Sequence, residues 1–289
     1  MPVLTVVDDH IALTDTSILH TGAPTLAADS GILVDVDTHR ILWERSPHLR
    51  HAPASLTKIM TTLVAMENFD LSRQVTITPD VLNQEVVETR LGLHAGEVLT
   101  VQELVTAMLM ASANDAATAV AQDTVGLGTF VDTMNAQVDA LGLHDSHFTT
   151  PVGLDDPQQY SSAYDLAVMT MATYDDFALV RQVMATHEVV LSSPLHATYD
   201  LHNIVNRLLT SYPPTVGGKS GYTDNAGPCL IAMAVRDHHR LLSVLLHTQK
   251  IVEDSHALLE WGFVQEGLAP LPVPSPPPAV PKAPVPRHP

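Results

Sequence analysis

A serine and a lysine lie three residues apart in PASLTKIM, residues 53–60, where a helical spacing of apolar residues begins. On a helix such residues share a face, so the hydroxyl of Ser55 and the amine of Lys58 can meet. A serine becomes a good nucleophile only when a base removes its proton. Lysine can be that base only if burial or a nearby cation lowers its pKa from about 10.4 toward neutrality. The same pattern also fits a serine N-cap beside a solvated lysine.

Two further segments carry polar residues that could join this pair. Ser112 and Asn114, in SAND, interrupt two apolar helical patterns; they could relay a proton and hold a substrate, or simply cap a helix. Lys219 and Ser220 lie in VGGKSGYTDNAG. A lysine beside a hydroxyl suits a carboxylate ligand, but a glycine loop entering an edge strand would contain the same residues.

The elements that must position these residues are strands near both ends of the chain and helices between them. Residues 31–45 predict two strands around a turn near Asp37 and Thr38, and two apolar runs around RDHHR predict a hairpin. Helical spacing marks the middle of the chain, with a capping box from Thr100 to Glu103 and an N-cap at Ser162. The pattern predicts an α/β (α+β) fold: one antiparallel sheet from N- and C-terminal strands, flanked by helices, with an inserted helical lobe.

Composition divides the chain into three parts. Residues 1–26 are interpreted as an N-terminal extension, residues 27–266 as the folded catalytic domain, and residues 267–289 as a disordered proline-rich tail. Proline fills ten of the twenty positions from 270 to 289, and such a segment cannot build a core.

The overall charge and the cysteine content exclude several classes of function. The formal net charge is −18, from 32 acidic and 14 basic residues, which disfavours nucleic acid as a partner. The single cysteine, Cys229, excludes an intramolecular disulfide and is expected to be a core residue. No run approaches the roughly 18–20 apolar residues of a membrane span, and the N-terminus does not resemble a signal peptide. The 16 histidines, in HLRH, HDSH and DHHR among others, lack ligand spacing, so no metal is predicted.

Taken together and in this order, S-x-x-K, S-x-N and K-S-G are far more specific than any one motif. Their surroundings include PASLTKIMTTLVAME, LMASANDAA, SHFTTPVGLDD, SSAYDLAVM and GGKSGYTDNAGPCLIAMA. Over roughly residues 31–263 the chain resembles the D-alanyl-D-alanine carboxypeptidases of serine peptidase family S11. The resemblance implies a β-lactamase/transpeptidase-like, penicillin-binding protein fold. It also implies a serine hydrolase that removes the terminal D-alanine of peptidoglycan stem peptides, needs no cofactor and is inhibited by β-lactams.

The resemblance also implies a role for each motif. Ser55 would be the nucleophile that forms the acyl-enzyme, and Lys58 its general base. Ser112 and Asn114 would relay a proton and position the substrate. Lys219 would bind the substrate carboxylate and keep Lys58 neutral by charge repulsion. Substrate-binding positions would follow at Ser220, Gly221, Tyr222 and Thr223.

Other implications concern the oxyanion hole and the departures from the family. The hole would be formed by the backbone N–H groups of Ser55 and Tyr222, and Arg240 would be a further carboxylate contact. The third motif reads KSG instead of KTG, which keeps the hydroxyl but loses a methyl group. The family implies a monomer outside the cytoplasm, secreted, periplasmic or associated with the cell wall, although no export signal or anchor is visible in the sequence.

Two alternatives stay open at the level of sequence. A serine β-lactamase of the same fold would need a residue that activates water for deacylation, and class A enzymes use a glutamate. Between Ser112 and Lys219 the chain has only Glu188, in a segment that is predicted to be a strand. The second alternative is a catalytically silent peptidoglycan-binding module displayed on the proline-rich tail.

Overall fold

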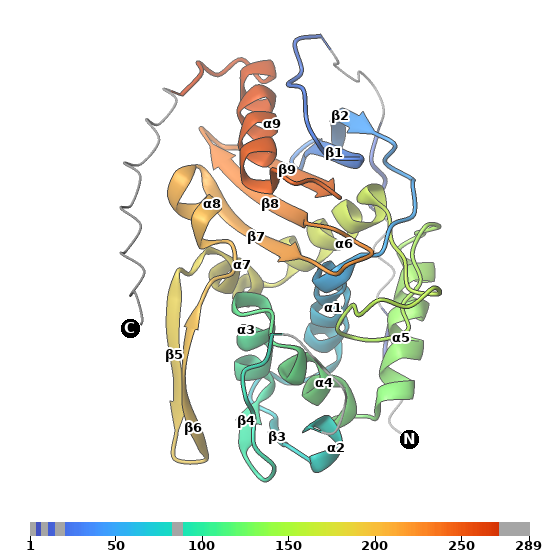
Figure 1. The fold of residues 1–289 in the computed structure, drawn as a ribbon, viewed down its shortest axis with the longest axis vertical. Helices are drawn as coiled ribbons and strands as arrows, with labels where there is room; N and C mark the ends of the chain where they lie inside the picture. Colours follow the sequence, from blue (N-terminus) through green and yellow to red (C-terminus); the bar gives the residue numbers. More distant parts are fainter. Residues whose placement is uncertain (1–3, 7–10, 15–20, 83–88, 272–289) are drawn as a thin grey trace, which may run out of the picture.

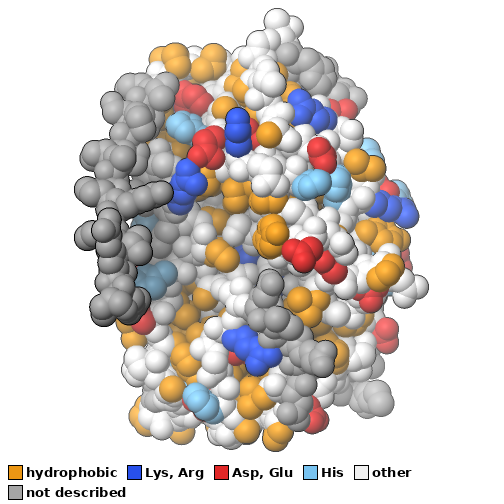
Figure 2. Space-filling view, viewed as in Figure 1, with side chains coloured by type: hydrophobic (Ala, Val, Ile, Leu, Met, Phe, Trp, Pro, Cys, Tyr) orange, Lys and Arg blue, Asp and Glu red, His pale blue; other side chains and the backbone are white. Residues whose placement is uncertain are grey.

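The computed structural model describes residues 4–6, 11–14, 21–82 and 89–271 (Figure 1). Residues 272–289, most of the predicted proline-rich tail, lie outside the described residues, as does much of the predicted N-terminal extension. Within the described residues, no helix has both the length and the apolar character needed to cross a bilayer. Among the described side chains on the face shown in Figure 2, basic residues are scattered between acidic ones and form no continuous basic surface.

A five-stranded antiparallel sheet joins strands from the two ends of the chain, as predicted. The strand order is β2-β1-β9-β8-β7. The strands are β1 (Ser30–Asp35), β2 (Arg40–Arg45), β7 (Thr215–Gly221), β8 (Cys229–Arg236) and β9 (His239–Leu246). The predicted pairs β1–β2 and β8–β9 are both confirmed as antiparallel hairpins. The fold prediction is therefore confirmed, because the N-terminal hairpin completes the sheet beside β9.

The two faces of this sheet are buried by different helices. On β9, Leu242 and Val244 face one apolar cluster, whereas Leu241 and Leu245 face the other, as the two-residue period of a strand requires. One face packs against α9 (Ile251–Gln265) and α8 (Asn206–Ser211), and the other packs against α6 (Ala163–Asp176). The sheet is thus a buried middle layer between helices, with β7 at one of its edges (Figure 1).

The helical lobe is inserted between β2 and β7. Its elements are α1 (Lys58–Asn68), β3 (Gln74–Thr76), α2 (Pro79–Leu82), β4 (Val98–Thr100), α3 (Val101–Met110), α4 (Asn114–Gln122), α5 (Leu127–Ala140), α7 (Ala178–Ala185), β5 (Glu188–Ser193) and β6 (His196–His202), together with α6.

Both predicted helix starts are confirmed. Thr100 and Glu103 form a reciprocal capping box, and the Ser162 side chain accepts a hydrogen bond from the backbone N–H of Asp165.

The start of α1 differs in detail from the sequence prediction. Ser55 lies in a 3₁₀ turn, Ala54–Thr57, and the α-helix proper begins at Lys58. Side chains three residues apart are nearly eclipsed in a 3₁₀ turn, whereas they are rotated apart in an α-helix. The tighter turn therefore aligns Ser55 more directly with Lys58 than the predicted α-helix does.

Helix α5 supports α1 through a fully buried aromatic side chain, and this contact can be tested. The rings of Phe130 and Phe69 lie 6.5 Å apart, and Phe130 is 0% exposed. Because Phe130→Ala leaves a cavity in the core, we expect it to lower the free energy of unfolding by about 3–5 kcal/mol. Chemical denaturation would measure this loss. The exposed Asp132→Ala on the same helix is the control, and equal effects of the two changes would contradict the packing.

Candidate active site

Three distant segments meet beside the 3₁₀ turn. Ser55 and Lys58 come from the turn and α1, Asn114 from the start of α4, and Lys219 from β7. The amine of Lys58 lies 2.9 Å from Ser55 Oγ and 2.7 Å from Asn114 Oδ1. The amine of Lys219 lies 2.8 Å from the hydroxyl oxygen of Ser112, which precedes α4. Five residues from the three predicted motifs, Ser55, Lys58, Ser112, Asn114 and Lys219, therefore belong to one cluster.

The contacts of Lys58 suit a neutral amine. Its side chain is 0% exposed, and its third partner is the backbone carbonyl of Val152 at 2.9 Å. The amide oxygen of Asn114 and this carbonyl can only accept hydrogen bonds. A neutral amine has two N–H groups for these two acceptors and one lone pair for the proton of the Ser55 hydroxyl. Once the amine is neutral, its lone pair can therefore face the Ser55 hydroxyl while both N–H groups remain hydrogen-bonded.

The electrostatic surroundings lower the pKa of Lys58 well below its ordinary value. Complete burial is the main cause and the positive charge of Lys219 adds to it, while the carboxylate of Asp115 opposes both. Burial also lowers the pKa of Lys219 to about 7. Repulsion between two ammonium groups is mutual, so we expect the two buried lysines not to be protonated at the same time.

The polar residues of SAND do not cap α4. The N-cap position is Ala113, which makes no side-chain capping bond. Ser112 instead has a positive φ of 57° and is 2% exposed, with its hydroxyl against Lys219. Asp115 accepts hydrogen bonds from the backbone N–H groups of residues 91–93. Ser112 therefore does not cap α4, and of the Asp115 hydrogen bonds only that from the backbone N–H of Ala116, at 3.0 Å, stays within the first turn of the helix.

Sequence reasoning missed the loop that supplies Val152. Gly153, the next residue, has φ 91°, and a Cβ atom there would lie 1.8 Å from the carbonyl oxygen of Ala54. The loop thus lies directly against the 3₁₀ turn, at a distance that only glycine allows. The glycine in the sequence PVGL was the one available signal, since a backbone carbonyl has no side-chain signature.

Strand β7 also approaches the 3₁₀ turn through a glycine. A Cβ atom on Gly221 would lie 2.9 Å from the backbone nitrogen of Ser55 and 3.0 Å from Ala54 Cβ. Tyr222 follows with 57% of its surface exposed, and the carbonyl of Ser220 accepts a hydrogen bond from Lys219. The end of β7 and the backbone of Ser55 are therefore in contact.

Two other polar residues considered from the sequence lie outside this cluster. Arg240 lies opposite Val235 in the β8–β9 ladder, and its guanidinium pairs with Asp37 and Asp175 at 2.6 Å each. The expectation that Arg240 contacts a bound carboxylate is therefore wrong, because the register of the sheet directs it to other partners. Glu188 begins β5 with a side chain that is 74% exposed. Among the described residues, no group of three His, Cys, Asp or Glu is arranged to hold a metal.

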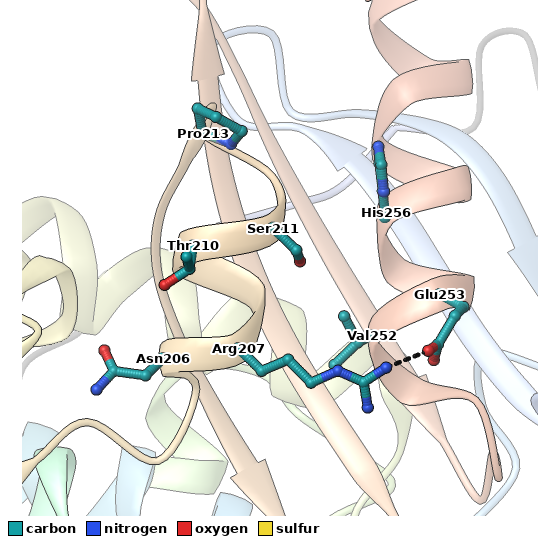
Figure 3. Close-up of a pocket in the computed structure, with 8 residues that line it drawn as sticks. All are labelled: Asn206, Arg207, Thr210, Ser211, Pro213, Val252, Glu253 and His256. Atoms are coloured by element: carbon teal, nitrogen blue, oxygen red, sulfur yellow. Dashed lines mark hydrogen bonds and ion pairs between the residues drawn. The ribbon is translucent and has the colours of Figure 1, made fainter. Parts of the chain in front are cut away.

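A surface cavity of about 740 Å³ between α8 and α9 involves none of these side chains (Figure 3). An ion pair between Arg207 and Glu253 joins the two helices there. The lining residues are Asn206, Arg207, Thr210, Ser211, Pro213, Val252, Glu253 and His256. The cavity contains no hydroxyl beside a buried amine. The candidate active site is therefore identified by the contact between Ser55 and Lys58, and not by the size of a cavity.

Comparison with known proteins places these features in a family. Residues 18–250 match the peptidase S11 family, D-alanyl-D-alanine carboxypeptidase. The chain is 35% identical to D-alanyl-D-alanine carboxypeptidase DacF of Bacillus subtilis over 75% of its length and 57% of the relative. It is 31% identical to DacB2 of Mycobacterium tuberculosis, over 83% of the chain and 84% of the relative. It is 36% identical to DacA of Escherichia coli K12, over 84% of the chain and 62% of the relative.

Solved structures are similar as well. The D-alanyl-D-alanine carboxypeptidase from Mycobacterium tuberculosis H37Rv has a TM-score of 0.78 at 28% identity, covering 88% of this chain and 96% of that one. The Streptomyces K15 DD-transpeptidase has a TM-score of 0.78 at 26% identity, covering 84% of this chain and 99% of that one. The fold is therefore that of the DD-transpeptidases and penicillin-binding proteins.

The coupling between the two buried lysines gives a test that needs no substrate. Removing the charge in Lys219→Met takes a cation away from Lys58, so we expect the pKa of Lys58 to rise. The sequence has only four lysines, at positions 58, 219, 250 and 282, which makes NMR titration of their side chains straightforward. Lys250→Met is the control: it removes an exposed charge and should leave the pKa of Lys58 unchanged. An unchanged or lower pKa of Lys58 in Lys219→Met would refute the coupling.

Proposed function

The chain belongs to the peptidase S11 family, and from this membership we propose that it removes the terminal D-alanine of peptidoglycan stem peptides through a serine acyl-enzyme. The chain spans 57% and 62% of the Bacillus and Escherichia relatives but 84% of the mycobacterial one. The observation that carries the proposal is the 2.9 Å contact between Ser55 Oγ and the buried amine of Lys58.

In the proposed acylation step, Ser55 Oγ attacks the carbonyl of the penultimate residue while neutral Lys58 takes its proton. The other two contacts of Lys58, with Asn114 and Val152, hold its lone pair toward the hydroxyl. The C–N bond to the terminal D-alanine then breaks, and its amine receives a proton from Lys58 or from Ser112. Water hydrolyses the resulting ester and regenerates Ser55.

The proposed oxyanion hole consists of the backbone N–H groups of Ser55 and Tyr222. Support comes from the close approach at Gly221, where a Cβ atom would lie 2.9 Å from Ser55 N. Preorganised donors of this kind stabilise the charge that develops on the tetrahedral intermediate. On the leaving-group side, Lys219 and the half-buried Ser220 are the proposed partners of the terminal carboxylate.

The partners and location follow from the same proposal. A β-lactam presents a strained amide and a carboxylate to the same groups, so we expect it to acylate Ser55. Peptidoglycan lies outside the cytoplasmic membrane, and the enzyme would act there. The β-lactamase alternative gains no support from Glu188, whose exposed carboxylate at the start of β5 is not part of the cluster.

Labelling with a fluorescent penicillin tests the nucleophile and its base. Wild type should be labelled and Ser55→Ala should not. Lys58→Ala should lower the acylation rate by at least about a hundredfold, because the serine then lacks its general base. Circular dichroism would check folding, and Lys250→Ala is the matched lysine control.

Normal acylation of Lys58→Ala would mean that the base lies elsewhere. An unlabelled wild type would favour the silent binding module. Rapid steady-state hydrolysis of a chromogenic cephalosporin would point to a β-lactamase instead of a carboxypeptidase.

A second test addresses the oxyanion hole. Gly221→Ala adds a methyl group 2.9 Å from Ser55 N, so strand and turn must separate. Losing one hole donor typically costs on the order of a hundredfold to a thousandfold in rate, and we expect a loss of this size in acylation. Gly128→Ala on α5 meets no atom within 4 Å and serves as the control. Equal acylation by both variants would exclude this position for the hole.

A further inference from the structure

A carboxylate outside the three motifs joins two walls of the candidate site. One oxygen of Asp155 accepts a hydrogen bond from the Thr223 hydroxyl at 2.5 Å, and the other accepts from the backbone N–H of Asn225 at 3.2 Å. The Thr223 hydroxyl oxygen in turn accepts from the backbone N–H of Ala226 at 3.1 Å. The Asp155 carboxylate therefore holds the turn between β7 and β8 at two points.

The segments on the two sides of this contact serve different parts of the proposed chemistry. Asp155 lies three residues after Val152, whose carbonyl accepts from Lys58, and two residues after Gly153, which lies against the 3₁₀ turn. Thr223 directly follows Tyr222, the proposed donor to the oxyanion. Among the contacts of the described residues, the Asp155–Thr223 hydrogen bond thus links the loop that orients the base to the turn that carries the hole.

We propose that Asp155 is a positioning residue that fixes the oxyanion-hole turn relative to the loop that orients Lys58. This inference rests on the proposed function. It also gives Thr223 a different use from direct substrate binding, because its hydroxyl hydrogen is already donated to Asp155. Small displacements of catalytic groups matter here, since an error of about 1 Å can cost on the order of a hundredfold in rate.

The chemistry of the contact requires a carboxylate. Both donors, the Thr223 hydroxyl and the Asn225 N–H, approach separate oxygens of Asp155. An asparagine has one acceptor oxygen, and its NH₂ group would face one of these donors. Asp155→Asn therefore keeps the shape but loses half of the contact, while Asp155→Ala loses all of it.

The test separates the limiting acylation rate from the concentration of fluorescent penicillin that gives half of that rate. We expect Asp155→Ala and Thr223→Val to lower the limiting rate about 10- to 100-fold, with the half-saturating concentration changed less than about twofold. The limiting acylation rate of Asp155→Asn should lie between the rates of Asp155→Ala and the wild type. Thr223→Ser keeps the hydroxyl and should restore most of the rate lost in Thr223→Val. The double variant Asp155→Ala/Thr223→Val should lose less rate than the product of the two single losses, because both changes break the same Asp155–Thr223 hydrogen bond, although each also removes one contact of its own.

Asp156→Asn is the matched control for charge. Its carboxylate is exposed, one residue away, and accepts from the backbone N–H of Gln158 at 2.7 Å, a contact that asparagine can keep. It should acylate like the wild type. A second readout is the amide NMR signal of Tyr222, which should shift in Asp155→Ala but not in Asp156→Asn.

The outcomes separate this inference from the proposed function. If wild type is labelled through Ser55 and Asp155→Ala has the same limiting rate, only the positioning role is overturned. It is also overturned if Thr223→Ser is as slow as Thr223→Val, or if Asp156→Asn is as slow as Asp155→Asn, because charge and not the contact would then be responsible. A wild type that is not labelled overturns both the function and the inference.

Discussion

The burial of the Lys58 amine is the constraint on which the rest of the site depends. An isolated ammonium is costly to remove from water, so a fully buried lysine must be paired with a counter-ion or lose its proton. The partners of Lys58 are a hydroxyl, an amide oxygen and a backbone carbonyl, all of them neutral. The nearby carboxylate of Asp115 accepts hydrogen bonds from four backbone N–H groups, and a second buried lysine adds repulsion. The fold thus favours the amine form that can accept a proton.

Holding a neutral amine against a serine requires three segments to approach more closely than side chains usually allow. Gly153 and Gly221 make this possible, since a Cβ atom at either position would collide with the 3₁₀ turn. The turn itself is strained at Ala54, and the partner of Lys219 is strained at Ser112, both with positive φ. Such conformations cost free energy and persist only where the surroundings enforce them. Here the surroundings are the buried sheet on one side and the helical lobe on the other.

The arrangement also explains why the site lies at the junction of sheet and lobe. The sheet contributes Lys219 and the β7–β8 turn from a rigid strand, and the lobe contributes Ser112, Asn114 and the loop of Val152. Neither half alone contains both the proposed base, Lys58, and the proposed partner of the substrate carboxylate, Lys219. The contacts across the junction, including that of Asp155 with Thr223, therefore decide whether the parts act together.

The sequence by itself determined four of the five strands of the sheet, the capped helices and the three motifs, whereas β7 was expected to be a loop that leads into a strand. These follow from local signals: a two-residue period in strands, a capping box at Thr100, and polar residues that interrupt apolar patterns at Ser112 and Lys219. Only the tertiary structure decided that the Val152 carbonyl and Asp155 belong to the site, that Ser55 lies in a 3₁₀ turn, and that Arg240 does not take part. A backbone carbonyl has no side-chain signature, and the partner of an arginine depends on sheet register. Both are consequences of long-range packing, which local sequence patterns do not encode.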